Sequence, residues 1–146
     1  IFGQPVGEFD ILALVAGEMK VPTILISGDS KAIEQAGTNM PSTHTVITKY
    51  SIGTDGALCV HPDKICEQLR DETKRALKNV ASIEPSQISG PTQLTIRLRD
   101  VSLAPRLEWI PGIKKTGDAV FEFTGSNMKA IANIVYGVAT LVEAKF

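Results

Sequence analysis

The sequence has few of the residue types that carry chemistry in many other proteins. Its 146 residues include two cysteines, two histidines and one tryptophan, and aromatic residues make up 5% of the total. Two cysteines are too few for a disulfide scaffold, so a reducing, cytoplasmic compartment is expected. The formal net charge of −1 gives no electrostatic basis for binding nucleic acid or an anionic membrane. No apolar run reaches the length of a membrane span, so no membrane contact is expected.

What remains is the composition of an ordinary globular protein, with 43% apolar and 21% charged residues. The order of apolar runs and polar turns predicts an α/β fold, a mixed and mostly parallel sheet with helices on its faces. The whole chain, residues 1–146, is expected to form one such unit. We predict helices at 9–19, 29–36, 62–79 and 128–144, and strands at 22–27, 45–52, 92–99 and 120–124.

The first predicted helix is the most informative stretch. Its apolar side chains between Phe9 and Met19 cover nearly the whole circumference, which indicates a helix enclosed by protein. Glu8 lies one turn above Leu12 and in line with Val15, so we expect its carboxylate to face the interior. An inward carboxylate is costly unless donors, a cation or a metal ion compensate it. The residues alone leave two roles open for Glu8, a complement to the helix dipole or a metal ligand.

The histidines and cysteines form no recognisable site. His44 lies in a polar loop and is expected at the surface, and His61 precedes Pro62 at a predicted helix start, where capping is the expected role. Cys59, His61 and Cys66 do not follow a known zinc-binding spacing. No serine lies in a Gly-x-Ser-x-Gly turn, so a serine nucleophile cannot be assigned. The catalytic residues are therefore unknown at this point.

Two further features allow more than one interpretation. Gly28-Asp29-Ser30 joins a strand to a helix, where Asp29 or Ser30 can cap the helix or the turn can accept phosphate. The second possibility would make the chain a non-catalytic α/β module that binds a small molecule or phosphate. The last predicted helix carries no charge between Ile131 and Val142, so it is either enclosed within the subunit or meets another subunit.

A set of short motifs runs in one order along essentially the whole chain. They are Pro5-Val-Gly-Glu8, Val15-Ala-Gly17, Val21-Pro22, Ser27-Gly-Asp29, Thr48-Lys49, Cys59-Val-His-Pro62, Glu108-Trp109, Pro111-Gly112 and Lys115-Thr-Gly117. In this order they resemble the D-aminopeptidase family of zinc metallopeptidases. The resemblance implies zinc as cofactor, a short peptide with an N-terminal D-amino acid as substrate, and ring-like homo-oligomers. The glutamate of the Val-Gly-Glu motif is a zinc ligand in that family, so the resemblance favours Glu8 as a metal ligand.

The resemblance covers only the C-terminal half of the family's usual chain. We therefore expect these residues to be the C-terminal portion of a larger two-part subunit, with the N-terminal half of the same protein as a partner. In the family, the other zinc ligands and a proposed catalytic histidine precede the part that corresponds to Ile1. The resemblance thus implies that the 146 residues are inert alone. A third possibility is that they serve only as a structural or assembly half.

Overall fold

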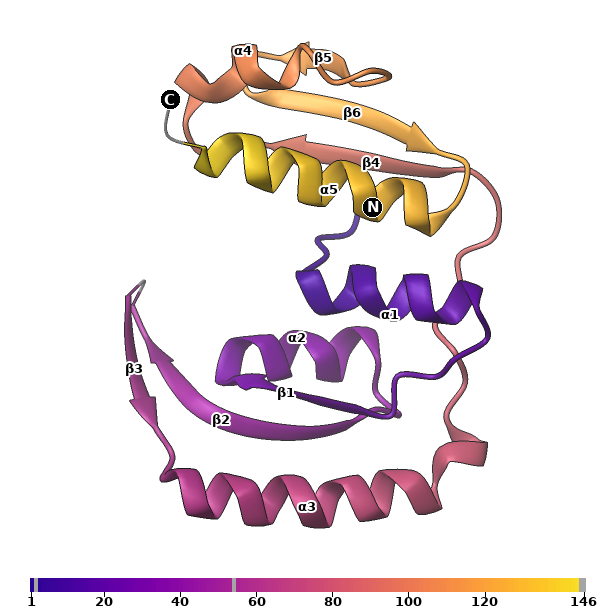
Figure 1. Ribbon diagram of the computed structural model, residues 1–146, viewed down its shortest axis with the longest axis vertical. Helices are drawn as coiled ribbons and strands as arrows, with labels where there is room; N and C mark the ends of the chain where they lie inside the picture. The colour runs from indigo at the N-terminus through magenta and orange to yellow at the C-terminus, as the bar shows by residue number, and fades with distance from the viewer. Residues whose placement is uncertain (2, 54, 145–146) are drawn as a thin grey trace. The chain divides into compact units, whose positions relative to one another are not determined.

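A computed structural model of the chain describes residues 1, 3–53 and 55–144 (Figure 1). These residues form two compact units, one made of residues 7–87 and the other of residues 1–6 together with 88–144. The prediction of a single α/β unit over residues 1–146 stays a prediction. None of the helices in the described ranges is both long and apolar enough to cross a membrane.

The unit of residues 7–87 contains a three-stranded sheet with strand order β1-β2-β3. Its elements are α1 (Glu8–Glu18), β1 (Leu25–Asp29), α2 (Ser30–Asn39), β2 (His44–Ile52), β3 (Gly56–Cys59), α3 (Pro62–Lys78) and a 3-10 turn (Val80–Ser82). β1 and β2 are parallel, whereas β2 and β3 form an antiparallel hairpin. The mixed α/β fold is confirmed, and the mostly parallel sheet is confirmed only in part, because β1·β2 is the one parallel pair among the strands that the structure describes.

Helices cover both faces of this sheet. Ile26 of β1 packs into an apolar cluster with Ala13 of α1 and Ala36 of α2, so these two helices share one face. His44 of β2 is bonded to Glu72 of α3, which places α3 on the other face. Figure 1 shows α1 and α2 above the strands and α3 below them. The predicted helices on the sheet faces are therefore present in this unit.

α1 departs from the expectation of a helix enclosed on all sides. Its buried residues include Asp10, Ala13 and Gly17, which follow one another on one face. Leu12 and Met19 are 51% and 67% exposed. The nearly uniform apolar sequence predicts that the helix is buried but does not indicate which face packs. The enclosure predicted for Leu12 and Met19 is wrong.

The other unit is built on an antiparallel sheet with strand order β4-β6-β5. Its elements are β4 (Thr92–Arg97), a 3-10 turn (Val101–Leu103), α4 (Ala104–Leu107), β5 (Lys114–Gly117), β6 (Val120–Gly125) and α5 (Met128–Glu143). β4 lies within the strand predicted at 92–99, pairs antiparallel with β6 and stands at one end of the strand order. β5 was not predicted, because its Lys-Lys-Thr-Gly sequence has no apolar face.

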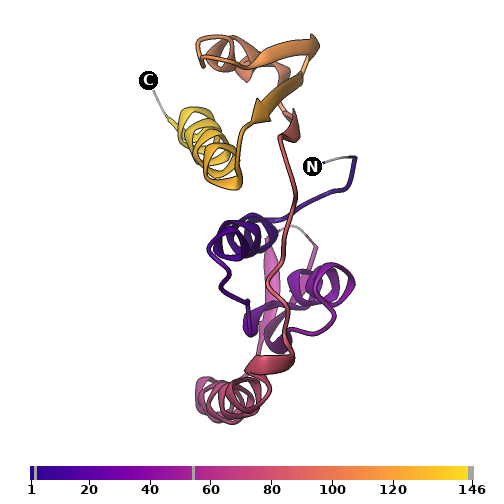
Figure 2. The same ribbon diagram turned by 90° about the vertical axis from the view of Figure 1, so that its right-hand side faces the viewer.

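α5 lies along one face of this second sheet (Figures 1 and 2). The core beneath it contains Leu107, Phe121 and Val138. Asn127 caps its first turn by accepting a hydrogen bond from the Ala130 N–H at 2.8 Å. Contacts within this unit therefore account for the buried face of α5, the predicted helix that carries no charge between Ile131 and Val142.

Candidate functional site

Glu8 is the first residue of α1 and is exposed. The inward orientation that we predicted for its carboxylate is therefore wrong. The stripe that it shares with Leu12 and Met19 is the open side of the helix. Glu8 nonetheless stands at the positive end of the helix dipole, where a carboxylate is stabilised by under about 1 kcal/mol. An exposed carboxylate in this place can coordinate a metal ion if other ligands approach it.

Asp10 is the carboxylate that α1 buries, with 5% of its surface exposed. Its Oδ2 accepts hydrogen bonds from the Gly7 N–H at 2.7 Å and from Gln35 Nε2 at 3.0 Å. Its Oδ1 accepts one from Asn39 Nδ2 at 3.0 Å. The buried carboxylate that we expected at Glu8 is therefore found at Asp10, and three neutral donors compensate its charge. Asp10 is held as a structural link between α1 and α2.

Local sequence signals point to part of this arrangement. Asp10 stands three residues after Gly7, the spacing at which an acidic side chain reaches back to the N-cap N–H. Gln35 and Asn39 are four residues apart, so they lie on the same face of α2. The sequence gives no signal that these two features meet, because 25 and 29 residues separate Asp10 from its amide partners.

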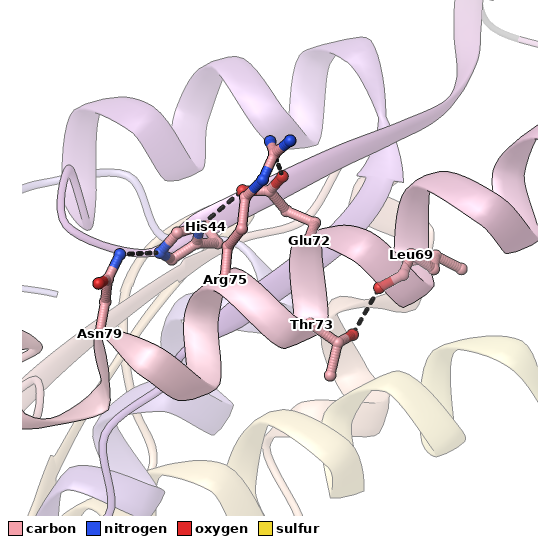
Figure 3. Close-up of polar contacts among 6 residues, drawn as sticks. All are labelled: His44, Leu69, Glu72, Thr73, Arg75 and Asn79. Atoms are coloured by element: carbon pink, nitrogen blue, oxygen red, sulfur yellow. Dashed lines mark hydrogen bonds and ion pairs between the residues drawn. The ribbon is translucent and has the colours of Figure 1, made fainter.

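His44 lies in a hydrogen-bonded network with α3, not in a surface loop (Figure 3). It begins β2, its side chain is 18% exposed, and its Nδ1 lies 2.6 Å from Glu72 Oε1. Asn79 Nδ2 lies 3.4 Å from His44 Nε2. The amide can only donate in this pairing, so Nε2 accepts and Nδ1–H donates to Glu72. Both ring nitrogens are engaged, which makes His44 a structural residue of the sheet–helix interface.

The same network makes unit 7–87 sensitive to acid. The hydrogen bond from His44 holds the pKa of Glu72 below its ordinary value of 4.5, with a smaller contribution from Arg75 at 3.0 Å. A lowered folded pKa contributes stability above the unfolded value and loses it as the pH falls through the folded pKa. We therefore expect wild type to lose stability more steeply than Glu72→Gln below about pH 4.5. Urea unfolding at several pH values measures this difference, with Glu67→Gln, an exposed position on the same helix, as control. Equal slopes for wild type and Glu72→Gln would contradict it.

The remaining histidine and the cysteines do not add to a site. His61 caps α3, because its Nδ1 accepts from the Asp63 N–H at 3.3 Å, as expected from its place before Pro62. Cys59 and Cys66 are free and exposed. Across residues 1, 3–53 and 55–144, no three His, Cys, Asp or Glu side chains are grouped so that they could hold a metal ion. The described residues therefore do not make a complete metal site, and Glu8 can supply at most one ligand to a shared one.

The strand–helix junction at Gly28 is already occupied by a carboxylate of the chain. Asp29 Oδ1 accepts from the Lys31 N–H at 2.9 Å and from the Ala32 N–H at 3.0 Å. These bonds, that with Ala32 first, hold the pKa of Asp29 below its ordinary value. The capping role predicted for Asp29 is confirmed. A phosphate at this turn would have to displace a negatively charged group, so the geometry does not favour the phosphate-binding alternative.

The motif residues Glu108, Trp109 and Lys115 lie in the second unit. Lys115 Nζ forms an ion pair with Glu108 Oε1 at 2.9 Å. Trp109 is 87% exposed and borders an apolar cavity of ≈ 540 Å³ together with Ile110 and Leu141. An exposed indole beside an apolar hollow is typical of a contact surface rather than of a core edge.

Comparison with known proteins gives the family of the chain. The sequence model described as D-aminopeptidase matches residues 1–136. The chain belongs to the D-aminopeptidase family. The family resemblance carried by the Val-Gly-Glu motif and the motifs that follow it is thereby confirmed.

One sequence match and one structural match, both from Bacillus subtilis, show what this chain is similar to. The D-aminopeptidase of Bacillus subtilis (strain 168) is 29% identical over 126 residues, which are 86% of this chain and 46% of that protein. The solved structure of the Zn-dependent D-aminopeptidase DppA from Bacillus subtilis, described as a self-compartmentalizing protease, matches with a TM-score of 0.88 and 26% identity. That match covers 99% of this chain and 53% of DppA. The chain thus spans about half the length of these D-aminopeptidase relatives.

Proposed function

We propose that this chain is part of a zinc-dependent aminopeptidase that removes N-terminal D-amino acids from short peptides. The observation that carries the proposal is the family match over residues 1–136, together with the match of nearly the whole chain to a Zn-dependent D-aminopeptidase structure. The parent protein forms a homo-oligomer, which the self-compartmentalizing neighbour supports. Two free, exposed cysteines support a reducing, cytoplasmic location.

Glu8 supplies one carboxylate ligand to zinc in this proposal. The remaining ligands come from the part of the parent that these 146 residues do not include. The lack of a three-ligand group among the described residues and the greater length of the relatives both support this division. Bound zinc supplies Lewis-acid polarisation of the scissile carbonyl. The role of α1 is to fix Glu8 in place, with Asp10 holding the start of the helix against α2.

The first test compares the 146-residue chain with a parent of the relatives' length. We expect the parent to contain zinc and to release D-alanine from short peptides with an N-terminal D-alanine. The 146-residue chain alone should release none, because it lacks the other ligands. Metal analysis and a D-alanine assay measure both quantities. Zinc-dependent release by the short chain alone would overturn the proposed division of ligands.

The second test concerns Glu8 itself, in the parent. We expect Glu8→Gln to weaken zinc binding by at least the roughly 10–100-fold that loss of a supporting residue costs. Glu18→Gln, at the other end of α1 and also exposed, is the matched control and should bind zinc as wild type does. Zinc affinity is measured by competition with a chelator. Unchanged affinity in Glu8→Gln would remove Glu8 from the metal site.

A further inference from the structure

Among the strands that the structure describes, β1 has a neighbour on one side only, because the strand order is β1-β2-β3. The His44 N–H donates to the Ile24 carbonyl at 3.1 Å, so the backbone groups of Ile24 face β2. Backbone groups alternate along a strand, and those of Ile26 therefore face β2 as well. The N–H and C=O groups of Leu25 and Ser27 point the opposite way. No strand in the described part of the chain pairs with that edge.

The composition of β1 is that of an interior strand. The one charged residue of β1 is its last, Asp29, whose carboxylate accepts hydrogen bonds from the Lys31 and Ala32 N–H groups. Residues 23–28 contain no charge and no proline, the devices that usually protect an exposed edge. Both faces of the sheet are covered, by α1 and α2 around Ile26 and by α3 on the side of His44. Parallel strands covered on both faces are typically found inside a sheet rather than at its border. An apolar, unprotected strand at the edge therefore indicates that its neighbour lies outside these residues.

We infer that the outer edge of β1 is a pairing surface for a β-strand from the part of the parent peptidase that these 146 residues do not include. The chain spans 46% and 53% of its two relatives, so a parent of their length has room for such a strand. Backbone hydrogen bonds to Leu25 and Ser27 would join the two parts of the subunit. This inference rests on the proposed function only in placing the chain within a longer peptidase.

The side of β2 that faces away from β1 serves as a comparison over residues 45–47, which β3 does not cover. β3 pairs only with Lys49–Ile52 of β2. By the same alternation, the backbone groups of Thr45 and Ile47 point away from β1. That edge is flanked by charged side chains of α3, among them Lys64 and Glu67, around a cavity of ≈ 570 Å³. Such charges discourage strand addition beside Thr45 and Ile47, so we assign the pairing surface to β1 rather than to this part of β2.

Amide hydrogen exchange in the parent tests the inference without reference to zinc or activity. We expect the amides of Leu25 and Ser27 to exchange about as slowly as that of Ile26, which faces β2 and reports that the sheet is intact. In the 146-residue chain, the Leu25 and Ser27 amides should exchange about 10-fold faster or more, while Ile26 stays slow. Fast exchange of Leu25 and Ser27 in the parent would overturn the inference. So would protection in the short chain that grows with its concentration, because a second copy would then occupy the edge.

Proline substitution gives a second, independent measurement in the parent. Ser27→Pro removes one outward N–H without touching a bond to β2, and prolines are tolerated on edge strands with that geometry. We expect it to return the Leu25 amide to fast exchange. Thr45→Pro, which removes an N–H of β2 that points away from β1, should leave Leu25 slow. Equal effects of the two variants would overturn the assignment to β1, and the wild-type comparison decides the matter if Ser27→Pro does not fold.

Discussion

Gly17→Ala is expected to destabilise the fold by about 3 kcal/mol or more, the upper end of the range for overpacked sites. A Cβ at Gly17 would lie 1.6 Å from the Ser86 carbonyl oxygen and 2.7 Å from its carbonyl carbon. Both contacts are with backbone, so no side chain can rotate to make room. The segment around Ser86 would have to move away from α1. Urea unfolding followed by far-UV circular dichroism measures the loss.

Gly37→Ala is the matched control, because it makes the same change inside a helix. A Cβ at Gly37 would meet nothing within 4 Å. Replacing glycine by alanine in the interior of a helix stabilises it by about 0.5–1 kcal/mol when space allows. The two substitutions should therefore have opposite signs, although helix propensity alone predicts the same gain for both. A stabilising Gly17→Ala would contradict the close packing of α1 on the Ser86 segment.

Local signals account for most of the elements predicted from the sequence. Asp29 and Asn127 begin helices because their side chains accept hydrogen bonds from N–H groups within three residues, which sequence spacing reveals. The alternation of apolar residues in 92–99 likewise predicts a strand, found as β4. β5 escaped prediction because it is held by its neighbour β6 rather than by its own residue preferences.

The orientation of α1 could not be predicted in the same way. Apolar side chains occupy almost every position from Phe9 to Met19, so the helical period carries little information about the packed face. That face is set by contacts with α2, which are distant in sequence. His44 shows the same limit, because Glu72 and Asn79 are 28 and 35 residues away. Partners at such separations leave no trace in a single sequence.

The candidate site was also predictable only in part from the sequence. The family motif singled out Glu8 as a zinc ligand, and the structure leaves its carboxylate exposed at the start of α1. The argument from burial, which also pointed to Glu8, applies instead to Asp10. Two carboxylates two residues apart therefore have different roles, because one lies on the packed face of α1 and the other on its open side. The two carboxylates should therefore differ in how much their removal lowers the free energy of unfolding.

Asp10→Ala is expected to destabilise the fold by about 2–3 kcal/mol. The change leaves the Gly7 N–H, Gln35 and Asn39 without their shared acceptor, and lost acceptors for partly buried donors cost about 1–3 kcal/mol. Glu8→Ala should cost under about 1 kcal/mol, because that carboxylate is exposed and complements the helix dipole. Urea unfolding of both variants, at a pH where both carboxylates are charged, gives the comparison. Equal losses would mean that α1 is held through Glu8 as much as through Asp10, and the division of roles between them would fall.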